Sequence, residues 1–109
     1  MSNAGFTKTP SPPYYAVIFT SARTQGDQGY SAMADKMVEM ASQQPGFLGV
    51  ESVRGENGVG ITISYWENEA SIARWKANSE HQVAQAYGKK RWYQDYVVRV
   101  AKVERAYAK

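Results

Sequence analysis

The sequence predicts an α+β fold, in which a four-stranded antiparallel sheet carries two helices on one face. Apolar residues alternate along four segments of the chain and recur at helical spacing in two others. The six segments follow one another as strand, helix, strand, strand, helix, strand, which is the order of the ferredoxin-like split β-α-β repeat. A chain of 109 residues has the usual length of a single domain.

The first segments are predicted to be an arm followed by a central strand. Residues 1–13 contain three prolines, which fix φ and remove backbone donors, so an N-terminal arm is expected there and the domain itself over residues 14–107. Residues 14–23 are rich in β-branched and aromatic residues, and their apolar side chains fall on both alternating faces. A strand that is apolar on both faces is typical of the middle of a sheet.

A helix and a hairpin are expected next. Apolar residues at helical spacing begin at Tyr30 and continue to Ala41, and Pro45-Gly46 ends the run. Residues 47–54 and 60–66 then alternate as strands on either side of an Asn57-Gly58 turn, which favours a β-hairpin.

The second half of the chain is predicted to contain a helix and a last strand. Asn68 is expected to cap the helix, because its side chain can accept from the free amides of the first turn. We expect a break near Asn78-Ser79, with Ser79 capping a further helical segment over residues 80–87. The last strand is predicted over residues 93–107, with a β-bulge where its apolar phase changes between Val100 and Ala101.

The face of this sheet opposite the helices would expose many valine, isoleucine and aromatic side chains. So large an apolar surface is unusual for a stable monomer. A homodimer with two-fold symmetry is the simplest way to cover it, and we predict one.

Several motifs resemble the antibiotic biosynthesis monooxygenase (ABM) family. They are the stretch PGFLGVES at residues 45–52, ISYWENEA at 63–70, and Trp75 followed by His81, and the likeness spans residues 14–105. The resemblance implies a dimeric α+β barrel, in which two ferredoxin-like sheets face each other and each subunit keeps a pocket between its sheet and its helices. The family includes cofactor-free monooxygenases that oxidise phenolic rings, haem-degrading oxygenases and proteins without known activity.

The haem-degrading members differ from this chain at two of three positions. They use an asparagine on the first strand, a helix tryptophan, and a histidine about three helical turns later. Trp75 matches the tryptophan, but residues 14–23 contain no asparagine, and His81 comes early, with Gln85 near the expected place. Haem binding or degradation is therefore the third and least favoured hypothesis, and we expect no Soret shift when hemin is added.

The candidate site residues are aromatic or polar and lie in the second half of the chain. His81, the only histidine, is the hypothetical proton acceptor, because only its unperturbed pKa lies close to neutrality; the alternative is a structural histidine bonded to backbone. Trp75, which matches the family position, is the second catalytic candidate. An aromatic-walled pocket suits a flat ring, although each tryptophan could instead be part of the core. Arg99 could hold an anionic oxygen or lie in solvent. The remaining predicted pocket residues are Trp66, Trp92, Asn78 and Tyr65.

The function that we expect is a cofactor-independent monooxygenase acting on a small aromatic, phenol- or quinol-like compound. The alternative is a non-catalytic ligand-binding or stress-related module of the same fold. No metal is expected, since one histidine without cysteine offers no ligand spacing. No nucleic acid is expected either, because the basic residues near the C-terminus carry no recognition signature, and the absence of cysteine and of long apolar runs favours a cytoplasmic protein without membrane segments.

Overall fold

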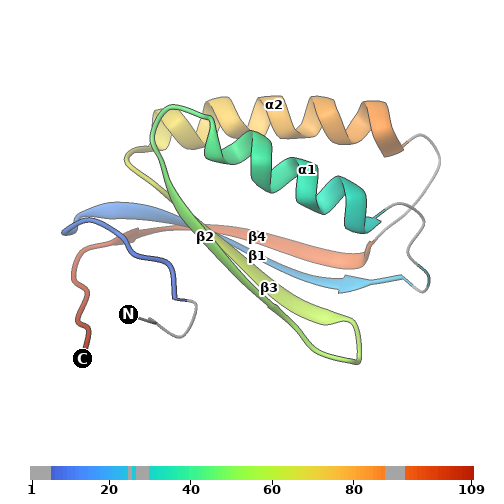
Figure 1. Cartoon of the computed structure of the whole chain (residues 1–109), viewed down its shortest axis with the longest axis horizontal. Helices are drawn as coiled ribbons and strands as arrows, with labels where there is room; N and C mark the ends of the chain where they lie inside the picture. The colour runs from blue at the N-terminus through green and yellow to red at the C-terminus, as the bar shows by residue number, and fades with distance from the viewer. Residues whose placement is uncertain (1–5, 25, 27–29, 88–92) are drawn as a thin grey trace.

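The computed structural model describes residues 6–24, 26, 30–87 and 93–109, with the backbone alone for residues 81–87 and 94. The strands and helices follow one another in the predicted order (Figure 1). In chain order they are β1 (Tyr14–Arg23), α1 (Tyr30–Ser42), β2 (Phe47–Arg54), β3 (Val59–Trp66), α2 (Glu69–Tyr87) and β4 (Tyr93–Val103).

The four strands form one antiparallel sheet in the order β2-β3-β1-β4. Strand β1 lies between β3 and β4, so the prediction of a central first strand is confirmed. Both helices lie on the same side of the sheet (Figure 1), where α1 contacts β2 and α2 contacts β3. The predicted ferredoxin-like α+β fold is therefore confirmed.

The strand register assigns each side chain to one of two faces, because residues directly opposite in an antiparallel pair point the same way. Trp66 stacks on Trp75 of α2, which places Trp66 and its cross-strand neighbours under the helices. We call this side the helix face; it includes Val17, Phe19, Ser21, Phe47, Ser64, Trp66, Tyr96, Val98 and Val100. The opposite side is called the open face, and it includes Ala16, Ile18, Glu51, Val53, Ile61, Ile63, Tyr65, Val97 and Arg99.

The junction between α1 and β2 is tightly packed. Gly46 has a φ of +86°, and a Cβ built there would lie 2.0 Å from Ser71 Oγ on α2. The Gly46 carbonyl accepts from the Glu67 amide at 2.8 Å, which ties this turn to the end of β3. The glycine therefore lets the chain turn left-handed while α2 packs directly against it.

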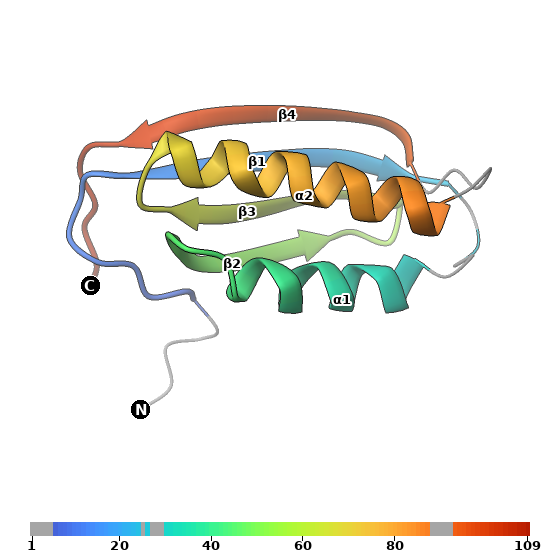
Figure 2. The same ribbon diagram turned by 90° about the horizontal axis from the view of Figure 1, so that it is seen from above.

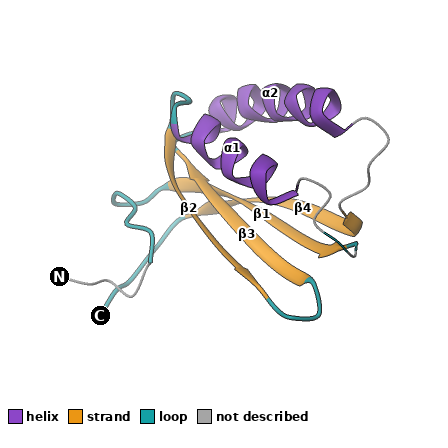
Figure 3. Ribbon diagram, turned by 45° about the vertical axis from the view of Figure 1, so that its right-hand side comes forward, coloured by secondary structure: helices purple, strands orange, loops and turns teal. Residues whose placement is uncertain are grey.

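The arm of residues 6–13 lies against one end of the open face. The Thr7 amide donates to Glu51 Oε1 at 3.0 Å, and its hydroxyl donates to the Val50 carbonyl at 2.6 Å. Thr9 donates to the hydroxyl of Tyr14 at 2.9 Å. Tyr14 and Ala16 are accordingly buried on this face. Toward the hairpin turn, which extends beyond both helices (Figure 3), Val53, Val59 and Ile61 remain exposed.

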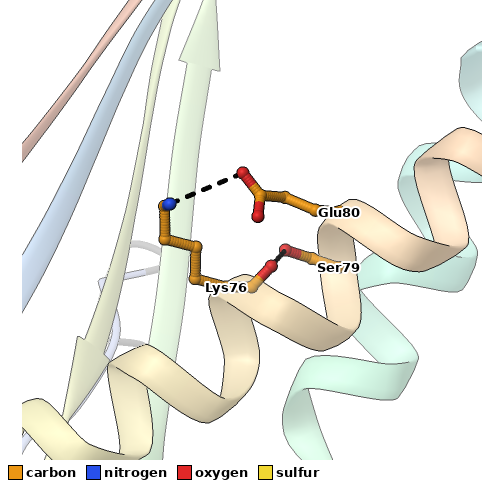
Figure 4. A network of polar contacts seen from close by, with 3 residues as sticks. All are labelled: Lys76, Ser79 and Glu80. Carbon is orange, nitrogen blue, oxygen red and sulfur yellow. Dashed lines mark hydrogen bonds and ion pairs between the residues drawn. The ribbon is translucent and has the colours of Figure 1, made fainter.

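Helix α2 is continuous, so the predicted break near Asn78-Ser79 is wrong. The Asn68 cap is confirmed, since its Oδ1 accepts from the Ser71 amide at 2.9 Å. Ser79 does not cap a new helix: its hydroxyl donates to the Lys76 carbonyl at 3.1 Å, within the same helix (Figure 4). Lys76 and Glu80 also pair across this position at 3.6 Å. Neither α1 nor α2, over the residues described, has the length and apolarity needed to span a membrane.

Strand β4 differs from the prediction in its end and its register. It ends at Val103, which pairs with Tyr14, the first residue of β1; beyond it β1 offers no partner for residues 104–107. No bulge lies between Val100 and Ala101, because the β1–β4 register is regular from Val103 to Asp95 and shifts only at Ala22/Arg23. The apolar phase changes because β4 presents valine to both faces of the sheet.

Candidate functional site

Three aromatic rings pack together at one end of the helix face. Trp66, fully buried, stacks on Trp75 at 6.1 Å between ring centroids, and Phe47 meets it edge-on at 5.5 Å. The indole of Trp66 donates to Ser64 Oγ at 2.9 Å, so its polar atom is satisfied within the sheet. Trp75 on α2 and Phe47 on β2 are both half-buried, so part of each ring is accessible at the surface.

Helix α2 also carries Asn78 and His81. Asn78 is half-buried one turn after Trp75, and the His81 backbone follows six residues after Trp75, about 9 Å along the axis. The side chain of His81 and the whole of Trp92 lie outside the described residues. The roles predicted for both stay predictions.

Tyr65 and Arg99 lie on the open face, so the described contacts do not bring them together with Trp66 and Trp75. Tyr65 meets Tyr14 edge-on at 5.8 Å and donates to Glu51 Oε2 at 3.1 Å. Burial and the nearby Glu51 carboxylate raise the pKa of Tyr65 to about 12. Arg99 is exposed on β4. Strand alternation separates Tyr65 from its neighbour Trp66, although the two are adjacent in sequence.

A second aromatic cluster, which sequence reasoning missed, lies at the other end of the helix face. The Tyr93 hydroxyl donates to that of Tyr30 at 3.3 Å, and Phe19 contacts Tyr93 at 5.1 Å and Tyr96 at 5.5 Å between ring centroids. The guanidinium of Arg23 lies 3.7 Å from the centre of the Tyr30 ring. These residues come from the end of β1, the start of α1 and the start of β4, so no local motif signals their meeting.

Burial and the nearby positive charges shift the pKa of the Tyr93 hydroxyl in opposite directions. Burial raises the pKa of its hydroxyl, the hydrogen bond to Tyr30 raises it further, and the charges of Arg54 and Arg23 lower it. The net shift is upward, so Tyr93 stays a neutral phenol near pH 7. Arg54 is fixed beside this cluster by its bonds to Ser21, including one to Ser21 Oγ at 2.7 Å. The result is a neutral hydrogen-bonding phenol close to two positive charges.

Next to the second cluster, β4 presents an exposed apolar surface on the helix face. Figure 2, seen from the helix side, shows β4 outside the area that α1 and α2 cover. Tyr96, Val98 and Val100 are 59%, 50% and 51% exposed there. We call these three residues the β4 strip. An apolar strip bordered by aromatic rings and positive charge offers a flat, partly anionic molecule both a surface and a counter-charge.

No group of three potential metal ligands among histidine, cysteine, aspartate and glutamate occurs in the part of the chain that the structure describes.

Comparison with known proteins gives consistent results. The family model described as Antibiotic biosynthesis monooxygenase matches residues 13–87. The chain is 54% identical over 99 residues to the uncharacterized protein YqjZ of Bacillus subtilis (strain 168), covering 91% of this chain and 87% of that protein. It is 30% identical over 95 residues to the jasmonate monooxygenase ABM of Pyricularia oryzae, covering 82% of this chain but only 43% of that longer protein.

A solved structure shows the same fold. It is a mutant of SnoaB, a cofactor-independent oxygenase from Streptomyces nogalater, with a TM-score of 0.70, 9% identity, and coverage of 85% of this chain and 95% of that chain. The family model spans most of the chain, including β1, β2, β3 and both helices. This protein belongs to the antibiotic biosynthesis monooxygenase family.

Proposed function

We propose that this protein is a cofactor-independent monooxygenase that oxidises a small aromatic, phenol- or quinol-like compound bound over the β4 strip. The observation that supports this proposal best is the strip itself: its side chains are exposed and apolar, and Tyr96 at one end contacts Tyr93, which is bonded to Tyr30. Family membership supports the reaction class, as do the names of relatives that are a monooxygenase and a cofactor-independent oxygenase.

The proposed reaction needs no reductant beyond the substrate. A phenol with a free ring position and O2 give a quinone and water, so one oxygen atom enters the ring and the other leaves as water. The substrate supplies all the electrons, and its phenolate form is the species that can pass an electron to O2. Arg23 and Arg54 favour that form, because nearby positive charge lowers the pKa of a phenol.

In this proposal the predicted residues keep distinct roles. His81 accepts the phenolic proton, Trp75 and Trp92 form walls against which the ring stacks, and Asn78 supplies a polar contact. Trp66 supports Trp75 from below, since it is fully buried in contact with it.

Oxygen consumption tests the proposal directly. The protein is incubated with a panel of phenols and quinols, and O2 uptake and quinone absorbance are recorded. Val98→Lys is expected to lower turnover at least about tenfold by placing a charge in the apolar strip. Val38→Lys is the matched control, because Val38 is similarly exposed, 45%, but lies on α1 away from β4. Equal rates in both variants would contradict the assignment of the strip.

The same panel distinguishes catalysis from binding alone. Ligand-induced increases in melting temperature that Val98→Lys abolishes, without O2 uptake in the unmodified protein, would show a binding module and refute the monooxygenase. His81→Gln tests the proton acceptor separately: turnover at neutral pH is expected to fall and to recover as pH approaches the pKa of the substrate. A pH profile equal to that of the unmodified protein would remove His81 from the mechanism.

We also propose that the protein is a homodimer in which a second copy covers the open face. Val53, Ile61 and Val97 are 78%, 45% and 45% exposed on that face, beyond the part that the arm covers. Sedimentation equilibrium measures the mass in solution, and a monomer at all concentrations would contradict this proposal.

A further inference from the structure

The helix face is polar over β2 and β3, and apolar over β4, at the end of the sheet near the hairpin turn. Two neighbouring rows of the strand register cross all four strands there. In the order β2, β3, β1, β4 they are Ser52, Thr62, Phe19, Val98 and Arg54, Gly60, Ser21, Tyr96. The hydroxyls of Ser52 and Thr62 bond each other at 2.8 Å. A molecule that lies across these rows would therefore meet polar groups at one end and apolar side chains at the other.

Arg54 extends across β3 because Gly60 has no side chain. A Cβ built on Gly60 would lie 2.8 Å from the guanidinium carbon of Arg54. The Arg54 side chain can thus reach from β2 over β3 to β1, where Nη2 donates to Ser21 Oγ at 2.7 Å. Ser21 lies opposite Tyr96 of the β4 strip, about 4.8 Å from β4. The Arg54 charge also acts on the Tyr93 hydroxyl, and the Tyr93 ring contacts Tyr96 at 6.2 Å between centroids.

The guanidinium of Arg54 keeps donors for a ligand. An arginine has five N–H donors. Three are used by described residues: Nη1 donates to the carbonyls of Ser21 and Gly58, and Nη2 donates to Ser21 Oγ. The Nε–H and one N–H of Nη2 remain, and these two nitrogens form the edge of a guanidinium that a carboxylate bridges with two parallel bonds. Arg54 is half-buried, so part of its side chain is at the surface.

Among the described residues no acidic side chain pairs with Arg54. Its three acceptors are neutral oxygens, and the ion pair found in that part of the chain joins Lys76 to Glu80. Asp95 of β4 lies opposite Ala22, which places it on the open face. Removing a charge from water is costly unless an opposite charge compensates it. A bound anion would supply that compensation.

We propose that the aromatic substrate carries a carboxylate, which Arg54 holds while the ring lies on the β4 strip. This inference rests on the monooxygenase proposed above and narrows its substrates to hydroxylated aromatic acids. The carboxylate compensates the charge of Arg54, and the charge of Arg23 favours the phenolate form of the same molecule.

Binding of matched acids and amides tests the carboxylate. Isothermal titration calorimetry gives Kd for the isomers of hydroxybenzoate and for the corresponding hydroxybenzamides, which have nearly the same shape but no charge. At least one acid is expected to bind at least about tenfold more tightly than its amide, as a charge-assisted hydrogen bond would cause. Arg54→Gln should remove this preference. Arg54→Lys, which keeps the charge but cannot bridge a carboxylate, should retain part of it.

Arg74→Gln is the matched control. Arg74 also donates to a serine hydroxyl, that of Ser71 at 3.3 Å, but it lies on α2. Its replacement is expected to leave the preference for acids unchanged. Circular dichroism checks that each variant is folded. Where Arg54→Gln unfolds the chain, Arg54→Lys decides: a reduced preference supports the site, and an unchanged preference overturns it.

The outcomes separate this inference from the proposed activity. Acids that bind no better than their amides, or a preference that Arg54→Gln leaves intact, overturn the inference, while O2 uptake with neutral phenols would still support the monooxygenase. A preference that depends on Arg54, without O2 uptake from any compound, supports the carboxylate contact and refutes the monooxygenase. Acetate and inorganic phosphate are titrated as probes of charge alone. If either binds as tightly as the best acid, Arg54 binds free anions and the aromatic part of the inference is overturned.

Discussion

Gly46→Ala is expected to be among the most destabilising small changes in this chain. Two costs combine. An alanine at a φ of +86° adopts the left-handed region, which costs about 1–2 kcal/mol. Its Cβ would also lie 2.0 Å from Ser71 Oγ and 2.7 Å from Ser71 Cβ, and relieving such overpacking costs about 1–3 kcal/mol. The total of about 2–5 kcal/mol is a large part of the usual stability of about 5–15 kcal/mol for a domain.

Urea unfolding, followed by tryptophan fluorescence, measures this loss against a matched control. Gly58→Ala has the same backbone cost, because its φ is +87°, but its Cβ would make only ordinary contacts of 3.6 Å or more. Its expected cost is about 1–2 kcal/mol. Repeating Gly46→Ala in a Ser71→Gly background should reduce its cost to that of Gly58→Ala, because the clash is gone. Equal costs for the two alanine variants, or no coupling between positions 46 and 71, would refute the steric part of the reasoning.

Three further predictions concern stability. Trp66→Ala is expected to lower the free energy of unfolding by about 3–5 kcal/mol, because the side chain is fully buried, while Val53→Ala, 78% exposed, changes it by less than about 0.5 kcal/mol; similar losses in urea unfolding would contradict this. Asn68→Ala should cost about 0.5–2 kcal/mol by removing the cap at the Ser71 amide, and Asn68→Asp, which keeps the acceptor, should restore most of it in thermal unfolding. The folded pKa of Tyr65, about 12, lies above its usual value of 10.0, so its contribution to stability is present below pH 10 and is lost as pH rises toward 12. Tyr65→Phe should therefore flatten the decline of stability over that range, and an unchanged slope in unfolding measured at several alkaline pH values would count against the shift.

Local patterns in the sequence predicted the helices and strands well where a pattern was typical of one kind of structure only. Residues 47–54 and the start of the first helix at Tyr30 match the structure, because alternation and helical spacing were unambiguous there. Asn68 caps α2 as predicted, because its side chain accepts from the Ser71 amide. Ser79 was read as a cap because serine favours that position, but the same hydroxyl can bond back to a carbonyl inside a helix.

The candidate site was harder to predict, because it depends on which residues the topology brings together. Trp66 and Trp75 were both predicted as site residues, but that they meet follows only from the packing of α2 on β3. Tyr30 and Tyr93 are 63 residues apart, and only the pairing of β4 with β1 brings them together. Tyr65 was grouped with Trp66 from composition, although adjacent residues on a strand point to opposite faces.

The position of the arm has a practical consequence for work on this protein. Thr7 and Thr9 hold residues 6–13 against the sheet, and residues 104–109 also lie on the side away from the helices (Figure 1). An affinity tag fused to the C-terminus would therefore lie beside the surface where a second copy is proposed to dock. Self-association should be measured after such tags have been cleaved, since a bulky or charged extension there would compete with the contacts being measured.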